Sequence, residues 1–343
     1  MKKFLIFRTD KLGDFLIITN IIKKIKENYK NSHITVVGSP LNKILLKNYK
    51  IIDEIIIFNK NENFFKKIKI INSLLKSNYY AIFTLDGKSI SSLITLVANS
   101  KYKLGISYKF NIFYNFFWSK PNLFYNFLVF TFYEYFTSKK DLKKIEHLPS
   151  LIMKLANRLN FQINSKQLYY FPVSKKYKIN FKKIYNKKIK SRYVLIHFDE
   201  KWNDIIDIKN NLYEVISVFQ KKIKMKVIIT SNNNFFDYYI TFKQQAILNK
   251  NIYILENLNL MLFERFIANS QFSISCHSGF LVQVSGCNQT KIIDIINKKD
   301  YLWYSCWKPL NTKHKFVYKS NFNKRIKLKF IFKQILNASK RFK

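Results

Sequence analysis

The feature that most constrains the fold of this 343-residue chain is an alternation of strand-like and helix-like stretches. In the first hundred residues the spacing of apolar positions changes repeatedly between the period of a strand and that of a helix. Strands are predicted at Lys3–Arg8, Ile34–Val37, Ile55–Phe58 and Tyr80–Leu85, and helices at Phe15–Tyr29, Leu41–Asn48 and Phe64–Ser77. This order predicts a parallel sheet, because parallel neighbours need a long crossover connection.

The same alternation begins again after Phe171-Pro172. Strands are predicted at Tyr193–His197, Val227–Thr230, Ile252–Leu255, Phe272–Ser275 and Ile292–Ile295, and helices at Leu212–Lys222, Tyr238–Leu248 and Leu260–Ala268. Two such arrays predict an α/β protein with two lobes, whose sheets bind ligands outside the carboxyl ends of their strands. The predicted parts are an N-terminal domain at 1–172, a Lys-rich linker at 173–190, a C-terminal domain at 191–318 and a basic C-terminal helix at 319–343.

The formal net charge of +41 indicates attraction to anions, but no nucleic-acid partner is expected. Of the 61 basic residues only six are arginines, the residue that makes bidentate contacts to bases and phosphates. The joint abundance of lysine, isoleucine, asparagine and aromatic residues is what an A+T-rich coding genome produces. The anion could be a phosphorylated substrate or an acidic membrane surface, and charge alone does not choose between them.

Cysteine usage and the N-terminus favour the cytoplasm. The three cysteines, Cys276, Cys287 and Cys306, have no zinc-site spacing and are too few for a disulfide framework. The apolar run Phe4–Phe7 is too short for a signal peptide and is interrupted at once by charged residues. The sequence contains no P-loop and no dinucleotide-binding glycine motif, and no metal site is expected.

Two segments invite a membrane interpretation. Residues 111–136 are rich in aromatic side chains, but neither half reaches the roughly 20 apolar residues of a spanning helix. This segment is either a buried aromatic helical pair or a surface that dips into lipid. In the tail Lys319–Lys343, apolar residues recur at helical spacing among basic ones. The tail is a helix packed on a domain, a helix on a membrane surface, or both.

The first candidate for chemistry is the segment Arg8–Asp14, which joins the first strand to the first helix. Asp14 lies near a helix N-terminus, where free amides and the helix dipole stabilise a carboxylate. One interpretation is a simple helix cap. The other is a carboxylate at the carboxyl end of the sheet, able to remove a proton from a sugar hydroxyl.

The segment Phe4–Tyr29 resembles the first strand, loop and helix of glycosyltransferase family 9, the lipopolysaccharide heptosyltransferases. Further similar segments follow in the family's order, at Ile51–Ile56, Tyr80–Gly87, Tyr102–Ile106, Glu146–Leu148 and Tyr193–His197. Cys276–Gly279 stands where the family carries an Asp-Ser/Thr-Gly signature, so His277 replaces the aspartate. Val282 stands where a histidine is usual. The resemblance spans nearly the whole chain.

The resemblance implies the GT-B fold, in which two Rossmann-like domains face each other across a cleft. It implies an inverting, metal-independent transfer of heptose from ADP-heptose to a phosphorylated, lipid-linked core sugar, with no cofactor beyond the nucleotide-sugar substrate. A bacterial monomer, peripheral on the inner face of the inner membrane, is the expected setting. Two alternatives are the same fold with another nucleotide sugar and a non-catalytic relative that binds glycan or lipid. The loss of the signature aspartate at His277 and of the usual histidine at Val282 suggests the second.

The resemblance also implies roles for individual residues. Asp14 matches the general base that activates the acceptor hydroxyl, and Lys201 matches a lysine that neutralises the donor diphosphate. Backbone amides at the helix start after Ser278-Gly279 suit a phosphate group. The acceptor-binding residues implied are Asp10, Lys11, Gly13 and Asp86, and the donor-binding residues are His197, Thr230, Ser231, Leu258, His277, Ser278 and Gly279.

Overall fold

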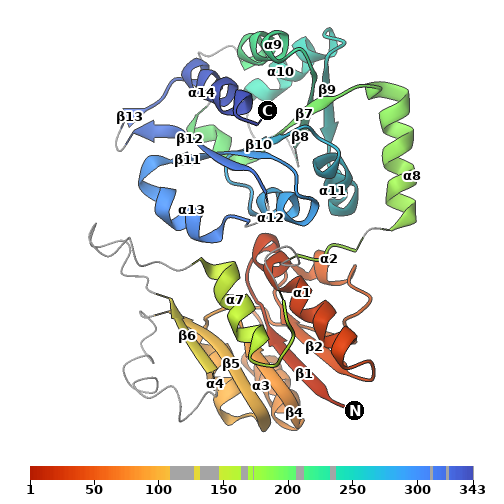
Figure 1. Cartoon of the computed structure of the whole chain (residues 1–343), viewed down its shortest axis with the longest axis vertical. Coiled ribbons are helices and arrows are strands. Elements are labelled where there is room, and N and C mark those ends of the chain that lie inside the picture. The colour runs from red at the N-terminus through yellow and green to blue at the C-terminus, as the bar shows by residue number, and fades with distance from the viewer. Residues whose placement is uncertain are drawn as a thin grey trace. The chain divides into compact units, whose positions relative to one another are not determined.

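The computed structural model describes residues 1–108, 127–131, 147–163, 169–172, 174–205, 212–231, 237–309, 312–321 and 324–342. The chain divides into two compact units, Met1–Pro172 and Val173–Lys343 (Figure 1). Most of the aromatic segment 111–136 lies outside the described residues, so the choice between its two interpretations stays open.

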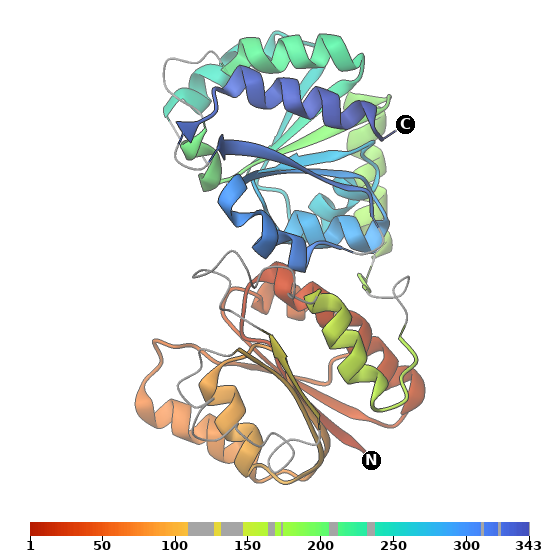
Figure 2. The ribbon, with the colours of Figure 1, turned by 60° about the vertical axis from the view of Figure 1, so that its left-hand side comes forward.

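The first unit is built on a six-stranded, entirely parallel sheet. The parallel arrangement is as predicted from the sequence, which indicated four of the six strands and missed β5 and β6. The strands stand in the order β3-β2-β1-β4-β5-β6. Their bounds are β1 Lys3–Phe7, β2 His33–Gly38, β3 Glu54–Ile57, β4 Tyr79–Thr84, β5 Ser100–Tyr108 and β6 Phe127–Thr131. The helices are α1 Leu12–Asn28, α2 Lys43–Leu46, α3 Phe64–Leu75, α4 Ser89–Val97 and α7 Leu148–Asn157. Figure 2 shows α1 and α7 on one face of the sheet, and α3 and α4 on the other.

The centre of this sheet is buried on both faces. Residues Phe4–Phe7 of β1 are almost fully enclosed, which explains why this strand reads as a continuous apolar run rather than an alternation. Helix α1 covers one face with Phe15, Ile18, Ile22 and Ile25, which recur at helical spacing and are fully buried. The sheet and the helix therefore share one apolar core.

The second unit has a seven-stranded sheet, parallel except for the short strand β13. The strands stand in the order β13-β12-β11-β10-β7-β8-β9. Their bounds are β7 Tyr193–Phe198, β8 Lys226–Ser231, β9 Ile252–Glu256, β10 Ser273–Ser275, β11 Ile292–Asn297, β12 His314–Asn321 and β13 Lys324–Arg325. The helices are α8 Lys175–Ile184, α9 Leu212–Ile223, α10 Asp237–Ile247, α11 Leu260–Ala268, α12 Gly279–Asn288, α13 Tyr301–Trp307 and α14 Leu328–Lys340.

The predicted linker at 173–190 differs from the structure. It contains α8 followed by a π-helical turn, Tyr185–Ile189, and it belongs to the second unit. The buried Phe181 ring meets the ring of Phe266 in α11, with 5.0 Å between the ring centroids. Many lysines on its outer side make α8 read as polar, although a few large apolar side chains are enough to dock it.

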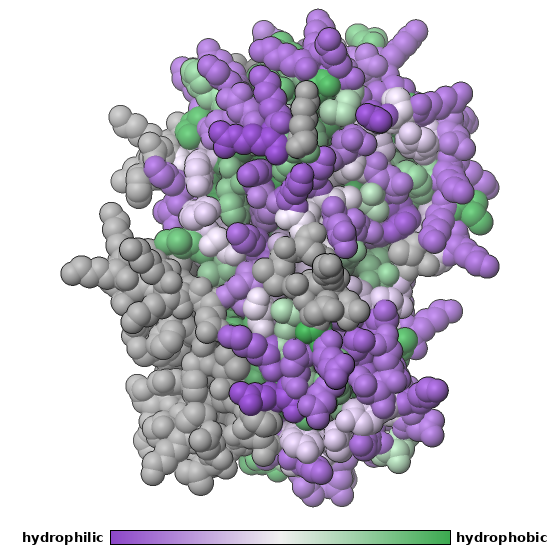
Figure 3. Space-filling view, in the orientation of Figure 1, coloured by the Kyte–Doolittle hydropathy of each residue, from purple (hydrophilic) through white to green (hydrophobic). Residues whose placement is uncertain are grey.

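The predicted C-terminal helix begins at Leu328 rather than at 319, because Lys319 belongs to β12. Leu328, Ile331 and Ile335 of α14 are fully buried in the core of the second unit. Packing on a domain therefore accounts for the apolar side of this helix. On the face drawn in Figure 3 the described side chains are mostly hydrophilic, with hydrophobic ones in small separate areas.

No helix among the described residues is both long enough and apolar enough to cross a membrane.

Replacing Ile331 by alanine should lower the free energy of unfolding of the second unit by about 2–5 kcal/mol, because it leaves a cavity in the core. Phe330→Ala is the matched control, because the Phe330 side chain, next to Ile331, is 49% exposed. This substitution should lower the free energy of unfolding by less than about 1 kcal/mol. Urea unfolding followed by tryptophan fluorescence measures both, with the fully buried Trp202 as a reporter. Equal losses would contradict the packing of α14.

Candidate functional site

In each sheet the order in which the chain adds strands reverses at one point. In the first unit the chain proceeds from β1 outward to β2 and β3, and then from β4 outward on the other side. In the second unit β7 and β10 have the same relation, and His197 of β7 pairs with Ser275 of β10. Such switch points open a crevice at the carboxyl edge of a parallel sheet, where ligands bind. Most of the predicted site residues end or follow these four strands, whereas Thr230 and Ser231 end β8 and Leu258 follows β9.

The loop after β1 is organised by the buried side chain of Arg8. Its Nε donates to the backbone oxygen of Asp14 at 2.9 Å, and its Nη1 donates to the backbone oxygen of Leu85, at the end of β4. Its guanidinium lies 3.5 Å from the Asp10 carboxylate and 3.7 Å from that of Asp14. A buried guanidinium needs such partners, so it holds β1, α1 and β4 together. This role of Arg8, one of only six arginines, was not predicted from the sequence.

Asp14 sits in the first turn of α1 with a side chain that is 31% exposed. One carboxylate oxygen accepts from the backbone N–H of Lys11 at 3.2 Å, which closes the first turn. Burial raises the pKa of Asp14, while the Arg8 guanidinium lowers it, and the net direction is upward. Asp14 therefore serves the helix start and is also an accessible carboxylate with increased basicity. The structure thus shows Asp14 capping the start of α1, and its role as a proton acceptor stays a prediction.

The other predicted acceptor-binding residues differ in exposure. Lys11 is exposed, Asp10 is half-buried, and Gly13 is buried in α1. Asp86 is 4% exposed, and it accepts from the hydroxyls of Thr9 at 2.6 Å and Ser91 at 2.8 Å. Asp86 thus positions the loop after β1, and its predicted contact with an acceptor stays a prediction.

Lys88 is a cation at this edge that the sequence analysis missed. Its Nζ donates to the backbone oxygen and the hydroxyl of Thr9, both at 2.7 Å. It also lies 3.4 Å from Asp10. Because these partners come from residues 79 positions apart, no local pattern signals them.

At the second switch point, Lys201 connects the loops after β7 and β10. It lies in a 3-10 turn, Glu200–Asp204, and its Nζ donates to the backbone oxygen of His277 at 2.7 Å. Ser278 and Gly279 follow directly and begin α12, whose first turn contains no acidic residue. The first amides of a helix have no partner within it, so a cation and several N–H groups converge at this edge.

His277 is held in a fixed orientation. Its Nδ1 lies 2.6 Å from a carboxylate oxygen of the fully buried Asp294 in β11. Its ring lies against that of Tyr304, with 3.5 Å between the ring centroids. Burial alone would raise the pKa of Asp294, but His277 and His314 outweigh it and hold that pKa well below its usual value. Asp294 therefore accepts as a carboxylate, and Nδ1 is the ring nitrogen that donates. An aspartate inside the apolar strand Ile292–Asn297 is the signal that could have identified this partner.

The remaining predicted donor-binding side chains lie mostly beneath the edge. His197, Thr230 and Ser231 are at most 4% exposed, and His197 Nδ1 lies 3.1 Å from the Thr230 hydroxyl. Burial lowers the pKa of His197 to about 4, so its imidazole is neutral near pH 7. These three form a polar layer under the site, whereas Leu258 is half-buried in the loop after β9.

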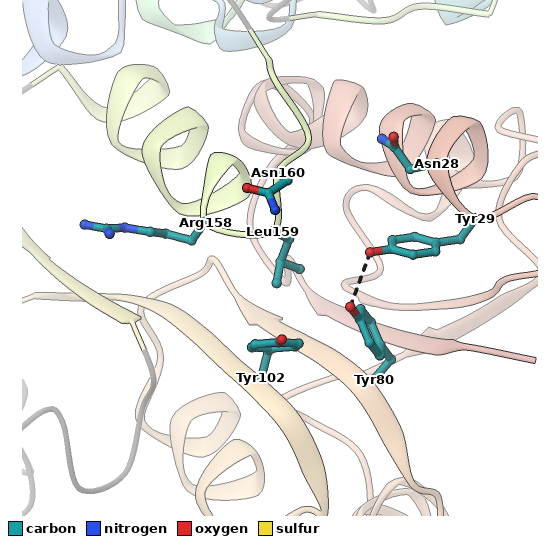
Figure 4. A pocket seen from close by; sticks show the side chains of 7 residues that line it. All are labelled: Asn28, Tyr29, Tyr80, Tyr102, Arg158, Leu159 and Asn160. Carbon is teal, nitrogen blue, oxygen red and sulfur yellow. Dashed lines mark hydrogen bonds between the residues drawn. The ribbon is translucent and has the colours of Figure 1, made fainter.

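Two further features concern metal ligands and the position of a pocket. In the described part of the chain no three His, Cys, Asp or Glu side chains form a group that could hold a metal ion. A pocket of about 240 Å³ lies at the opposite edge of the first sheet, where Tyr80 and Tyr102 lie near the starts of β4 and β5 (Figure 4). It is lined by Asn28, Tyr29, Tyr80, Tyr102, Arg158, Leu159 and Asn160. This pocket is therefore separate from the switch point.

Comparisons of sequence detect no matching family model and no curated relative. Comparison of structure finds full-length matches at low identity. A glycosyl transferase of family 9 from Veillonella parvula matches with a TM-score of 0.70 at 12% identity, covering 99% of this chain and 97% of that one. The E. coli heptosyltransferase WaaC with ADP-2-deoxy-2-fluoro heptose matches with a TM-score of 0.60 at 16% identity, covering 99% and 98%.

A UDP-GlcNAc 2-epimerase from Neisseria meningitidis, bound to UDP-GlcNAc, matches with a TM-score of 0.55 at 12% identity, covering 100% of this chain and 93% of that one. The chain therefore has the GT-B fold, shared by heptosyltransferases and these epimerases. The resemblance to glycosyltransferase family 9 is confirmed at the level of the fold over the full length.

Asp199, beside Lys201, should give the second unit a distinctive dependence on pH. Burial raises the pKa of Asp199 to about 6, from 3.8. The folded state therefore binds a proton that the unfolded state has released, and the resulting stability is lost as the pH rises through about 6. Relative to Asp199→Asn, the wild type should lose about 1–2 kcal/mol of unfolding free energy between about pH 4 and pH 7.

Asparagine keeps an oxygen that can accept from the backbone N–H of Lys201, so the turn is preserved in this variant. Urea titrations of both proteins across this range make the measurement. A constant difference between them would show that Asp199 has an ordinary pKa.

Proposed function

We propose that this protein is an inverting glycosyltransferase that moves a sugar from a nucleotide-sugar donor to a lipid-linked glycan acceptor. The observation that carries the proposal is the complementary chemistry of the two switch points. The first offers Asp14, an accessible carboxylate with a raised pKa. The second offers the Lys201 ammonium beside the start of α12. One suits proton removal and the other suits a diphosphate.

In the proposed reaction the acceptor hydroxyl oxygen attacks the anomeric carbon of the donor sugar. Its proton passes to Asp14, while the bond from that carbon to the diphosphate oxygen breaks and leaves the electron pair on the diphosphate. The single displacement inverts the anomeric centre. The raised pKa of Asp14 makes it a better acceptor for the proton.

The departing diphosphate gains negative charge as the bond breaks. Lys201 and the first amides of α12 are fixed before the reaction, so they stabilise this charge without reorganisation. Asp294 orients His277 through Nδ1, and in the imidazolium form of the ring Nε2 also carries a proton, which it can donate to a phosphate oxygen. We assign His277 to the donor on this basis, although it stands where family 9 has an aspartate.

The finer identity of the substrates is part of the same proposal. The likeness to a heptosyltransferase with an ADP-sugar analogue favours ADP-heptose, and a lipopolysaccharide core or related surface glycan as acceptor. The fold is also shared with epimerases that use UDP-GlcNAc, so another nucleotide sugar is the second candidate. We place the enzyme as a monomer in the cytoplasm, on the inner face of the inner membrane.

The first test is thermal stabilisation of the purified chain by a panel of nucleotides and nucleotide sugars. A ligand that binds only the native state adds RT ln(1 + [L]/Kd), about 2.7 kcal/mol at a hundredfold excess over Kd. We expect selective stabilisation by ADP and ADP-heptose. Lys201→Ala should lower the affinity for these ligands roughly tenfold or more. Lys222→Ala, on the exposed side of α9, is the matched control.

Each result of that test has a definite meaning. Stabilisation by UDP compounds would support a glycosyltransferase that uses a different nucleotide-sugar donor. No response to any nucleotide from folded protein would favour the non-catalytic relative.

Replacing Asp14 by asparagine should reduce turnover by about 10²–10⁴-fold, because the amide cannot take the acceptor proton. Thermal stabilisation by the donor should remain, because Asp14 belongs to the first unit, whereas the groups proposed to bind the diphosphate belong to the second. Glu27→Gln, an exposed carboxylate at the other end of α1, should leave turnover unchanged. A fully active Asp14→Asn protein would refute the assignment of the base.

A further inference from the structure

Helices α3 and α4 of the first unit expose a group of large apolar side chains. The two helices are in contact and cover the same face of the sheet (Figure 2). The exposed residues are Phe64, Phe65 and Ile68 of α3 and Ile90, Leu93 and Val97 of α4. The two phenylalanine side chains are the most open, at 69% and 77%. We call these six residues the α3–α4 patch.

Folding of the unit does not require these side chains. The core beneath is filled by other residues of the same helices, including Ile70, Ile71 and Leu74 of α3 and Ile94 of α4. In α4, Ile90, Leu93 and Val97 recur at helical spacing on the outer side, and the helix contains no charged residue. A surface helix ordinarily carries polar side chains there. Clustered apolar side chains on an outer face mark an interaction surface.

Lysines accompany the α3 part of the patch along the chain. Residues 60–76 contain five lysines and one acidic residue, Glu62, which pairs with Lys66 at 2.8 Å. A face that combines exposed aromatic rings with excess positive charge is complementary to an anionic lipid bilayer. A second copy of the chain would bring two such basic faces together, and their charges would repel.

We propose that the α3–α4 patch is a lipid-binding surface that docks the first unit on an anionic bilayer, with the Phe64 and Phe65 rings entering the interfacial region. The six residues of the patch belong to neither of the two segments named from the sequence, residues 111–136 and the tail Lys319–Lys343. The apolar side of α14 in the tail is occupied by the protein core.

The position of the patch relates it to the site. Phe64 begins α3 after β3, and Ile90 lies in the first turn of α4 after β4. Both therefore lie toward the carboxyl edge of the sheet, where Asp14 is found. Ser91, next to Ile90, donates to Asp86 at 2.8 Å, which ties the start of α4 to the loop after β1. Docking here would bring the carboxyl edge to the membrane, where a lipid-linked acceptor resides. This last step rests on the proposed function, whereas lipid binding does not.

The experiment is vesicle flotation of the full chain, with phosphatidylglycerol–phosphatidylcholine vesicles compared with pure phosphatidylcholine vesicles. We expect binding to the anionic vesicles only, and a roughly tenfold or greater loss of partition in the Phe64→Ser, Phe65→Ser double variant. Ile247→Ser with Leu248→Ser is the matched control, since these side chains of the second unit are 73% and 83% exposed. It should bind as the wild type does.

The proposal is overturned if the wild type does not float, if it floats equally with neutral vesicles, or if the control pair loses binding as much as the phenylalanine pair. A dimer in solution that the phenylalanine substitutions dissociate would identify the patch as a contact between copies instead. Thermal unfolding confirms that the variants fold. Vesicle binding needs no nucleotide sugar, so its failure is distinguishable from failure of the proposed enzyme activity.

Discussion

The parallel pairing of β1 with β2 on one side and β4 on the other determines where the first unit can hold a ligand. Two loops must leave adjacent strand ends toward opposite faces, and the polar backbone between them needs partners. The buried Arg8 side chain supplies these partners, because its guanidinium donates to backbone oxygens in the first turn of α1 and at the end of β4. The shape of the edge and the environment of Asp14 both depend on this buried charge.

The second unit solves the same problem with different chemistry. Its two central loops are joined by a lysine that donates to a backbone oxygen, and the histidine that follows β10 is anchored to a buried aspartate in the next strand. The first edge thus carries accessible negative charge held by an enclosed cation. The second carries accessible positive charge and N–H groups above an enclosed anion. This opposition is why we assign proton removal to one unit and the diphosphate to the other.

The sequence predicts the strands well because most of them are buried on both faces and read as short apolar runs. It also locates Asp14, Lys201 and His277, because each follows such a run. It fails where identity depends on distant partners. Arg8 depends on Leu85, 77 positions along the chain, and no local pattern indicates that contact. Asp294 depends on His277, and only its place inside an apolar strand signals it. It fails for α8 because lysines dominate its composition while only a few apolar residues dock it.

His277 has a φ of +55°, in the left-handed region that an L-residue occupies at a cost of about 1–2 kcal/mol. Glycine would remove that cost, and asparagine would reduce it. For a chain drifting under selection for foldability alone, this position is therefore expected to lose its imidazole. A lineage that keeps histidine here accepts a less stable backbone in exchange for a side chain. The residue found at this turn in descendants of the gene is thus a record of whether the site has remained in use.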